Sequence, residues 1–234
     1  MSIGQSISEV RERIEAAARR AGRSPAEIAL MGVTKTHSAD RIREAYAAGV
    51  RLFGENRVQE FAGKAAGLAE LNAAEWHMIG HLQTNKAVKA AELFVGVDSV
   101  DSMKLAEKLD SAARALGKKL KVLIEVNVGG ESAKSGLPPH SREFENLLLA
   151  AARFEALEVC GLMTVPPFSD NPEDTRPYFR SLRELREVIA ERKLPAIRME
   201  VLSMGMSHDF AVAIEEGSTL VRVGTAIFGE RARP

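Results

Sequence analysis

The sequence has only one cysteine and no excess of positive or negative charge. Its single cysteine, Cys160, cannot form an intramolecular disulfide, so we expect a reducing, cytoplasmic setting. Nowhere do two histidines and two cysteines cluster, as a typical structural zinc site requires, so we expect no metal. Lys+Arg and Asp+Glu both number 32, and this balance provides no basic field for nucleic acid or an anionic membrane.

Long apolar runs are missing as well. No stretch approaches the length of a membrane span, and the amphipathic N-terminus has no apolar centre of the signal-peptide type. Hydrophobic residues make up 45% and charged residues 27%, which is ordinary for a globular protein in water. A length of 234 residues suits one large α/β domain with a substantial core.

Short apolar segments alternate with amphipathic segments along the chain. Glycine follows several amphipathic segments, as at Gly22 and Gly117, which is typical of helix ends. The expected strands are 28–35, 50–56, 75–82, 93–100, 121–129, 157–168, which two prolines close, 199–206 and 219–230, which includes the last turn. The expected helices are 6–21, 39–49, 57–71, 84–92, 101–117, 142–154, 172–193 and 207–217.

This alternation predicts an α/β fold, a single (β/α)₈ TIM barrel with an extra N-terminal helix. The strands are apolar almost throughout, as expected when both faces of a parallel sheet are covered. An open doubly wound sheet is the alternative, but no G-x-G-x-x-G motif opens the first crossover. We therefore expect one domain over 1–234, in which 1–24 forms a helix that packs on the barrel.

Lys35 ends the first apolar strand, in the segment IALMGVTK. In such barrels the working face is the carboxyl end of the strands, where a partly desolvated lysine amine can attack an aldehyde. The alternative is a lysine that extends to solvent from a strand end. The strand by itself leaves both open.

The last two strands predict a phosphate site. Barrels often bind phosphate with these two loops, through backbone N–H groups, small residues and hydroxyls. Ser203, Gly205 and Ser207 are candidates on one loop, and Gly224 and Thr225 on the other. The alternative is that the glycines permit turns and a serine caps a helix. Because strand eight of a closed barrel pairs with strand one, a phosphate here would lie beside Lys35.

Two further residues are expected near Lys35. Asn56, after the second strand and beside Glu55, is positioned to hydrogen-bond a phenolic oxygen next to an aldehyde, or else caps the next helix. Arg222 alternates onto the same face as Gly224 and, inside a barrel, needs an acceptor. That acceptor is either a heteroaromatic ring nitrogen or a carboxylate such as those of Glu125 and Glu200.

Other polar residues have roles that the sequence does not assign. His77 either stacks beside a ring or is a hydrogen-bonded core histidine. His81 and Lys86 are candidates for the barrel mouth. The polar loop 129–139 is a lid, a second anion contact or simply a mobile loop.

Several long motifs resemble the YggS/PROSC family of pyridoxal phosphate homeostasis proteins. They are GVTKTHS, LFGENRVQE, WHMIGHLQTNK, KSG, GLMTVPP and LSMGMSHDFAVAIEEGSTLVRVGTAIFGER, and together they extend over most of the chain. The resemblance implies a barrel like the N-terminal domain of alanine racemase and pyridoxal 5′-phosphate (PLP) held as an aldimine on Lys35. It also implies phosphate contacts from the Ser203 region, Gly224 and Thr225, with Arg222 facing the pyridine nitrogen.

The resemblance further implies a PLP carrier or regulator without established catalysis, rather than an enzyme. Apo PLP-dependent enzymes are then its expected acceptors, and we expect a monomer. The alternative is an amino-acid racemase that uses PLP, which needs a second base opposite the lysine. Against this, Tyr46 and Tyr178, the only tyrosines, fall in expected outer helices, and the chain ends just after the last barrel motif. A phosphate-binding barrel enzyme of sugar metabolism would leave Arg222 unexplained.

Overall fold

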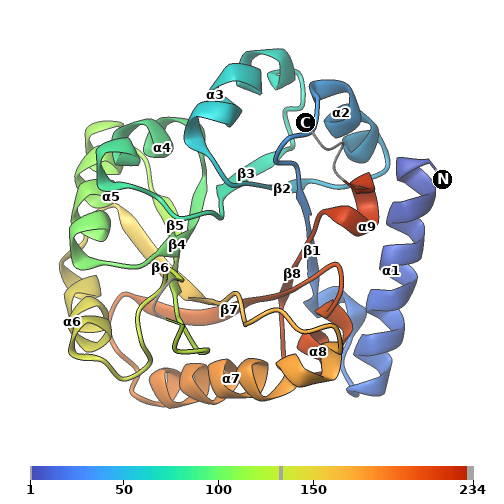
Figure 1. Ribbon diagram of the computed structural model, residues 1–234. Helices are drawn as coiled ribbons and strands as arrows, with labels where there is room; N and C mark the ends of the chain where they lie inside the picture. The colour runs from blue at the N-terminus through green and yellow to red at the C-terminus, as the bar shows by residue number, and fades with distance from the viewer. Residues whose placement is uncertain (1, 132–133, 231–234) are drawn as a thin grey trace.

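Within residues 2–131 and 134–230, which the computed structural model describes, eight parallel strands close into a barrel. Each strand pairs with the next, and β8 pairs with β1 (Figure 1). The strands are β1 (Ala29–Val33), β2 (Leu52–Glu55), β3 (Glu75–Met78), β4 (Gly96–Val100), β5 (Leu120–Glu125), β6 (Leu157–Met163), β7 (Ile197–Met206) and β8 (Leu220–Val223). The predicted TIM barrel is confirmed, and the open doubly wound sheet is wrong.

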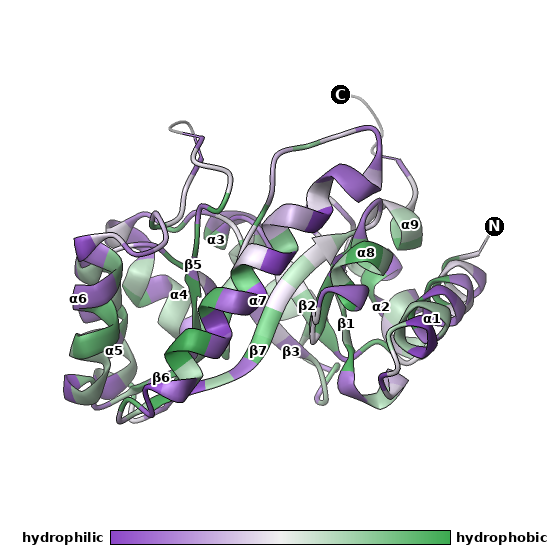
Figure 2. Cartoon of the chain, turned by 90° about the horizontal axis from the view of Figure 1, so that it is seen from below, coloured by the Kyte–Doolittle hydropathy of each residue, from purple (hydrophilic) through white to green (hydrophobic). Residues whose placement is uncertain are grey.

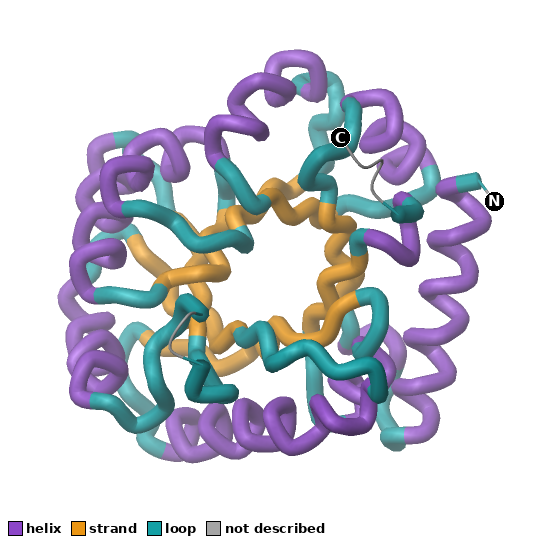
Figure 3. Tube along the Cα trace, in the orientation of Figure 1, coloured by secondary structure: helices purple, strands orange, loops and turns teal. Residues whose placement is uncertain are grey.

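Helices surround the ring of strands on the outside (Figure 3). They are α1 (Ile3–Arg20), α2 (Ala39–Ala47), α3 (Val58–Ala65), α4 (Ala87–Leu93), α5 (Met103–Ala115), α6 (Arg142–Ala150), α7 (Arg176–Glu191), α8 (Phe210–Glu215) and α9 (Thr225–Phe228). The barrel interior is therefore enclosed except at its two ends, and the loops that follow β5, β6 and β8 lie at the same end (Figure 2).

The burial of each element follows its residue pattern. Every residue of β4 and of β8 is buried, because the interior lies on one face of the strand and the helices cover the other. The outer helices bury one stripe only. In α7 this stripe is Phe179, Leu182, Leu185 and Ile189, at helical spacing, and the opposite face carries charged residues.

The extra N-terminal helix is present and longer than expected. It begins at Ile3 rather than at residue 6, because Ser2 and Gln5 form a reciprocal capping box. Its buried stripe includes Ile7, Val10 and Ile14, and it contacts α8 and α9 of the outer ring.

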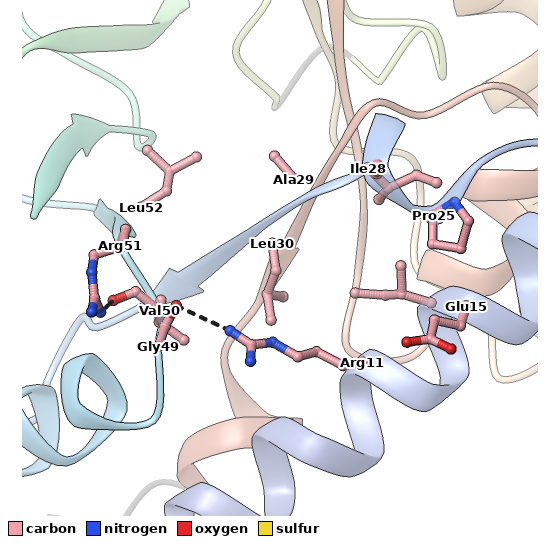
Figure 4. A pocket seen from close by; sticks show the side chains of 12 residues that line it. Arg11, Glu15, Pro25, Ile28, Ala29, Leu30, Gly49, Val50, Arg51 and Leu52 are labelled. Carbon is pink, nitrogen blue, oxygen red and sulfur yellow. Dashed lines mark hydrogen bonds between the residues drawn. The ribbon is translucent and has the colours of Figure 1, made fainter.

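A cavity of about 510 Å³ lies between α1 and the amino ends of β1 and β2 (Figure 4). Arg11 reaches from α1, and its Nη2 donates to the carbonyl oxygen of Gly49 at 3.0 Å (Figure 4). None of the predicted cofactor-binding residues lines this cavity. It is thus a gap in the packing of α1 at the amino ends of β1 and β2, whereas Lys35 follows the carboxyl end of β1.

The structure corrects two expected strands. β6 ends at Met163 rather than at residue 168, since Pro166 and Pro167 have no N–H for a ladder. The segment 219–230, expected as the last strand and its turn, is a strand only to Val223, after which Thr225–Phe228 forms the short helix α9 instead of a simple turn. The turn into α9 places Gly224 and Thr225 at the end of the barrel.

Candidate functional site

Lys35 lies just beyond the end of β1, at the carboxyl ends of the strands. The neighbours of β1 are β2 and β8, so the segments after these two strands lie on either side of it. A cavity of about 530 Å³ opens at this point, and Lys35, Asn56, Arg222, Gly224 and Thr225 all line it. Three strands thus bring five predicted residues to one cavity.

Arg222 lies inside the barrel with 4% of its surface exposed. Its Nη1 donates to Ser203 Oγ at 2.7 Å and its Nη2 to the Thr164 carbonyl oxygen at 2.8 Å. Burial lowers the pKa of its guanidinium, against the field of nearby carboxylates that include Glu125, but arginine stays charged in proteins. The alternative of a direct ion pair is wrong for Glu125 and Glu200, because neither lies within ion-pair distance of Arg222 among the described residues.

Ser203 and Gly205 do not line the cavity in this structure. Ser203 is fully buried, and its hydroxyl accepts the Arg222 bond. Gly205 has a φ of +93°, and a Cβ there would lie 2.6 Å from the Cβ of Ala213 in α8. These positions support Arg222 and the packing of α8, so a direct cofactor contact for either stays a prediction.

Ser207, on the same loop, does line the cavity. Its Oγ accepts hydrogen bonds from the backbone N–H groups of Gly224 and Ala226, both at 3.2 Å. The hydroxyl therefore joins the two loops that were expected to form a phosphate site.

Helix α9 is attached to the segment that carries Lys35. The ring of His37 stacks on that of Phe228 with 4.6 Å between centroids, and Arg41 donates to the carbonyl oxygen of Phe228. The closing pair of strands, β8 and β1, thus holds the candidate phosphate loop beside the candidate lysine.

Asn56 lines the cavity, and its Oδ1 is buried without a hydrogen-bond partner among the described residues. The alternative that it caps the next helix is wrong, because the N-cap of α3 is Arg57. A buried polar atom without a partner is costly. A half-turn of the amide would present the NH₂ instead, so Asn56 suits either a donor or an acceptor on a ligand.

His77 lies at the other end of the barrel interior. Its Nδ1 is 2.8 Å from Asp98 Oδ1, and both residues line a separate cavity of about 190 Å³. Burial alone would lower the pKa of His77, but the charge of Asp98 and the hydrogen bond to it outweigh burial and raise the pKa. The hydrogen-bonded core histidine is therefore the correct alternative, and the ring does not line the Lys35 cavity.

Of the remaining unassigned residues that the structure describes, only Lys134 of the loop 129–139 lines the cavity. His81 pairs with Asp101 at 2.9 Å, and neither His81 nor Lys86 lines the cavity. Of the loop 129–139, residues 132–133 lie outside the described part of the chain. Lys134 does line the cavity, where its Nζ donates to the Pro166 carbonyl oxygen at 3.1 Å and pairs with Glu131 at 2.6 Å.

Sequence reasoning missed two groups near the site. Asp209 lines the cavity with 4% exposure, its Oδ1 accepts from the Met206 N–H at 2.6 Å, and burial raises its pKa. Glu60 and Lys64, on α3, contact the residues on either side of Lys35. Their only signal was an ordinary i, i+4 pair of opposite charge, which helices show in many places.

The arrangement is suited to a small phosphorylated aldehyde. The cavity volume is in the usual range for small-molecule sites. The amine of Lys35, the buried guanidinium of Arg222 and the amide of Asn56 line it, and the Asn56 Oδ1 has no hydrogen-bond partner among the described residues. Two adjoining loops add backbone N–H and hydroxyl groups. Among the described residues, no group of three or more His, Cys, Asp or Glu side chains is placed to hold a metal ion. No helix in the same residues is long and apolar enough to cross a membrane.

Comparison with known proteins gives matches over nearly the whole chain. The family model described as alanine racemase, N-terminal domain, matches residues 6–232. A pyridoxal phosphate homeostasis protein of Aquifex aeolicus is 46% identical over 231 residues, which cover 99% of each chain. The crystal structure of an unknown protein from Bifidobacterium adolescentis is similar at 39% identity with a TM-score of 0.90, over 97% of this chain and 94% of that one.

A third relative has been solved with a ligand. PipY of Synechococcus elongatus, with PLP bound, is 37% identical with a TM-score of 0.85, over 97% of this chain and 100% of that chain. The sequence likeness and the likeness of fold therefore extend over the same part of the chain, which includes every residue of the candidate site.

Proposed function

The chain belongs to the family of pyridoxal phosphate homeostasis proteins, and we propose that it binds PLP through Lys35 and keeps this cofactor available without turnover of a substrate. One observation carries the proposal. Lys35, Asn56, Arg222, Gly224 and Thr225 line a single cavity, in a fold shared with a 37% identical relative that binds PLP. We place this role in the cytoplasm, in keeping with the single unpaired Cys160.

PLP, when bound, supplies an aldehyde carbon and a pyridine ring that can take up negative charge. Lys35 would hold the cofactor through its side-chain amine, which can condense with an aldehyde and release water. Thr225 would offer its backbone N–H and its hydroxyl to the phosphate, beside Gly224, whose own N–H donates to Ser207 Oγ and ties this loop to the end of β7. Asn56 would hydrogen-bond the phenolic oxygen of the ring. These contacts fix both ends of a small ligand relative to Lys35.

Arg222 and the absence of a tyrosine from the described residues that line the cavity together argue against efficient racemisation. Its guanidinium donates hydrogen bonds and accepts none, so a pyridine nitrogen that faces it stays unprotonated. An unprotonated ring stabilises a carbanion poorly, and removal of a proton next to the amino group of an amino acid is then slow. Tyr46 and Tyr178 lie in α2 and α7 of the outer ring, and neither lines the cavity to serve as a second base.

The test is a titration of purified protein with PLP, followed by borohydride reduction and mass spectrometry of the peptides. We expect covalent label on Lys35, and no label when Lys35→Ala is treated in the same way. Lys86→Ala, which changes a lysine of the barrel mouth outside the cavity, is the matched control and should behave as the parent does. An unlabelled parent would refute the proposal.

Delivery is tested separately. Loaded protein is mixed with an apo PLP-dependent enzyme in the presence of a trap for free cofactor, and the enzyme activity is followed. Activity that appears despite the trap supports apo enzymes as direct acceptors, whereas complete suppression by the trap limits the role to release of free cofactor. Alanine racemisation by loaded protein at ordinary enzyme rates, on the order of 1 per second or faster, would favour the racemase instead.

A further inference from the structure

Three charged side chains from the neighbouring strand and helix hold the residues on either side of Lys35. They are Glu55 at the end of β2, and Glu60 and Lys64 on α3, and together we call them the Lys64 clamp. None of the three lines the cavity that Lys35 lines. Any effect that they have on a cofactor must therefore pass through the main chain of the Lys35 segment.

The first contact is to Thr34, which is fully buried. Its N–H donates to the Gly54 carbonyl oxygen at 3.0 Å and continues the β1–β2 ladder. Its hydroxyl donates to Glu55 Oε1, and its carbonyl oxygen accepts from Lys64 Nζ at 3.0 Å. The donor, the acceptor and the side chain of the residue before Lys35 are all held.

The second contact is to Thr36. Its φ of +65° lies in the left-handed region, which β-branched residues rarely adopt and which persists only where surrounding contacts hold it. The N–H of Thr36 donates to Glu60 Oε1 at 2.5 Å. Because φ at Thr36 turns the chain immediately after Lys35, this bond helps to set the direction in which the Lys35 side chain leaves the barrel rim.

Lys64 joins the two contacts. Its ammonium, in a side chain 13% exposed, lies 2.7 Å from Glu55 Oε1 and 3.3 Å from Glu60 Oε1 and also donates to Thr34. Three partners match the three donors of an ammonium group. Burial raises the pKa of Glu55, and the hydrogen bonds from Lys64 and Thr34 oppose that rise. Lys64 therefore stabilises the charged form of a carboxylate that is otherwise cut off from water.

We propose that Lys64 is a positioning residue for Lys35: through Glu55, Glu60 and the backbone of Thr34 and Thr36, it holds the Lys35 amine in the orientation that captures the aldehyde of PLP. The inference rests on the proposed function, in which Lys35 is the covalent anchor. Small errors in the position of a reacting group slow reactions steeply, with losses near 10²-fold for about 1 Å. Loss of the clamp should therefore slow covalent capture.

The test compares Lys64→Met in two backgrounds. Methionine keeps an apolar stem of similar length and removes the ammonium. In the parent, we expect borohydride-trapped label on Lys35 to form about tenfold more slowly, as partial loss of orientation implies. In Lys35→Ala protein, where only non-covalent binding remains, Lys64→Met should leave PLP affinity by equilibrium dialysis unchanged. A loss of PLP affinity in the Lys35→Ala background as large as the slowing in the parent would overturn the inference, since the change would then act on the cavity itself.

Lys118→Met is the matched control. Lys118 is also a partly buried lysine, and its Nζ donates to the Phe94 carbonyl oxygen at 2.8 Å, away from the Lys35 cavity. It should cost thermal stability without slowing capture. If Lys64→Met and Lys118→Met slow capture equally, the effect is general destabilisation and the inference fails.

A second variant guards against failure of Lys64→Met to fold. Glu60→Ala changes a partly exposed residue and removes the acceptor for the Thr36 N–H, so it should slow capture in the same direction. Adding Thr36→Asn should restore part of the rate, because asparagine tolerates a positive φ better than threonine. Capture at the parent rate in Glu60→Ala would refute the positioning role. A parent that captures no PLP at all would instead refute the proposed function.

Discussion

Gly205→Ala separates the packing role that the structure gives this glycine from the cofactor contact expected of it. The φ of +93° at Gly205 is unfavourable for alanine, at a cost of about 1–2 kcal/mol. The added Cβ would also lie 2.6 Å from Ala213 Cβ and 2.9 Å from Phe210 Cα, so α8 must shift. Such overpacking costs roughly 1–3 kcal/mol. The sum predicts a loss of about 2–5 kcal/mol in the free energy of unfolding.

The assay is urea denaturation of the protein without PLP, with the midpoint and slope measured for each variant. Gly117→Ala is the control, because Gly117 also has a positive φ of +64° but no atom lies within 4 Å of the position that an added Cβ would take. Gly117→Ala therefore carries the cost of a positive φ without a steric clash. A loss in Gly205→Ala no larger than in Gly117→Ala would refute the packing argument. A large loss of PLP affinity in folded Gly205→Ala, with little loss of stability, would restore the cofactor contact.

Three other predictions concern the phosphate loop and two buried groups. Thr225→Val should clearly weaken PLP binding, measured by equilibrium dialysis, and should change the melting temperature little. Thr225→Ser retains the hydroxyl and should keep most of the affinity. If Thr225→Val binds PLP as tightly as the parent, the phosphate role of Thr225 is wrong. The raised pKa of His77 means that its pairing with Asp98 stabilises the fold fully below the ordinary histidine pKa of about 6.5, and that this contribution is lost as pH rises through the raised value. His77→Gln should therefore flatten the dependence of the urea midpoint on pH in that window, and an unchanged slope would show that the pair contributes nothing. Asp110→Ala should cost about 2–5 kcal/mol in the free energy of unfolding, because Asp110 Oδ1 accepts from two buried backbone N–H groups at 2.7 and 3.1 Å. Asp110→Asn keeps an acceptor and should cost less. Equal losses in the two variants would show that the charge of Asp110, rather than its acceptor oxygen, provides the stabilisation.

Much of the fold was readable in the order of apolar and amphipathic segments. Most strands are buried on both faces over most of their length and the helices on one stripe, so the two periods differ along the chain, although the first half of β7 is partly exposed. The errors fell where an apolar run continued past the end of its strand, as in 157–168 and 219–230. There the ladder ends for reasons outside the hydrophobic pattern: prolines without an N–H after β6, and a turn into α9 after β8.

The site was readable to a lesser degree. Polar residues at strand ends were recognisable, and barrel closure predicted that those of β8, β1 and β2 would lie together, as Arg222, Lys35 and Asn56 do. The sequence did not reveal that Ser207, rather than Ser203, faces the cavity. The sequence offered both serines, and the register of β7 against β8 shifts between Ser203 and Met206, so simple alternation of faces does not decide between them.

The sequence by itself determined which segments form the barrel and which strand ends carry an amine, an amide, a guanidinium and small residues, because these depend on local periodicity and on chain order. Only the tertiary structure decided which atoms of those residues meet. Glu60 and Lys64 are separated from Lys35 by more than twenty residues of sequence, yet they contact the backbone on both sides of it. Side-chain reach and the turn at Thr36 set these contacts, and neither leaves a periodic signal. Lys35 was therefore visible as a candidate in the first apolar strand, whereas the group that holds it in place became visible only when β1, β2 and α3 were packed together.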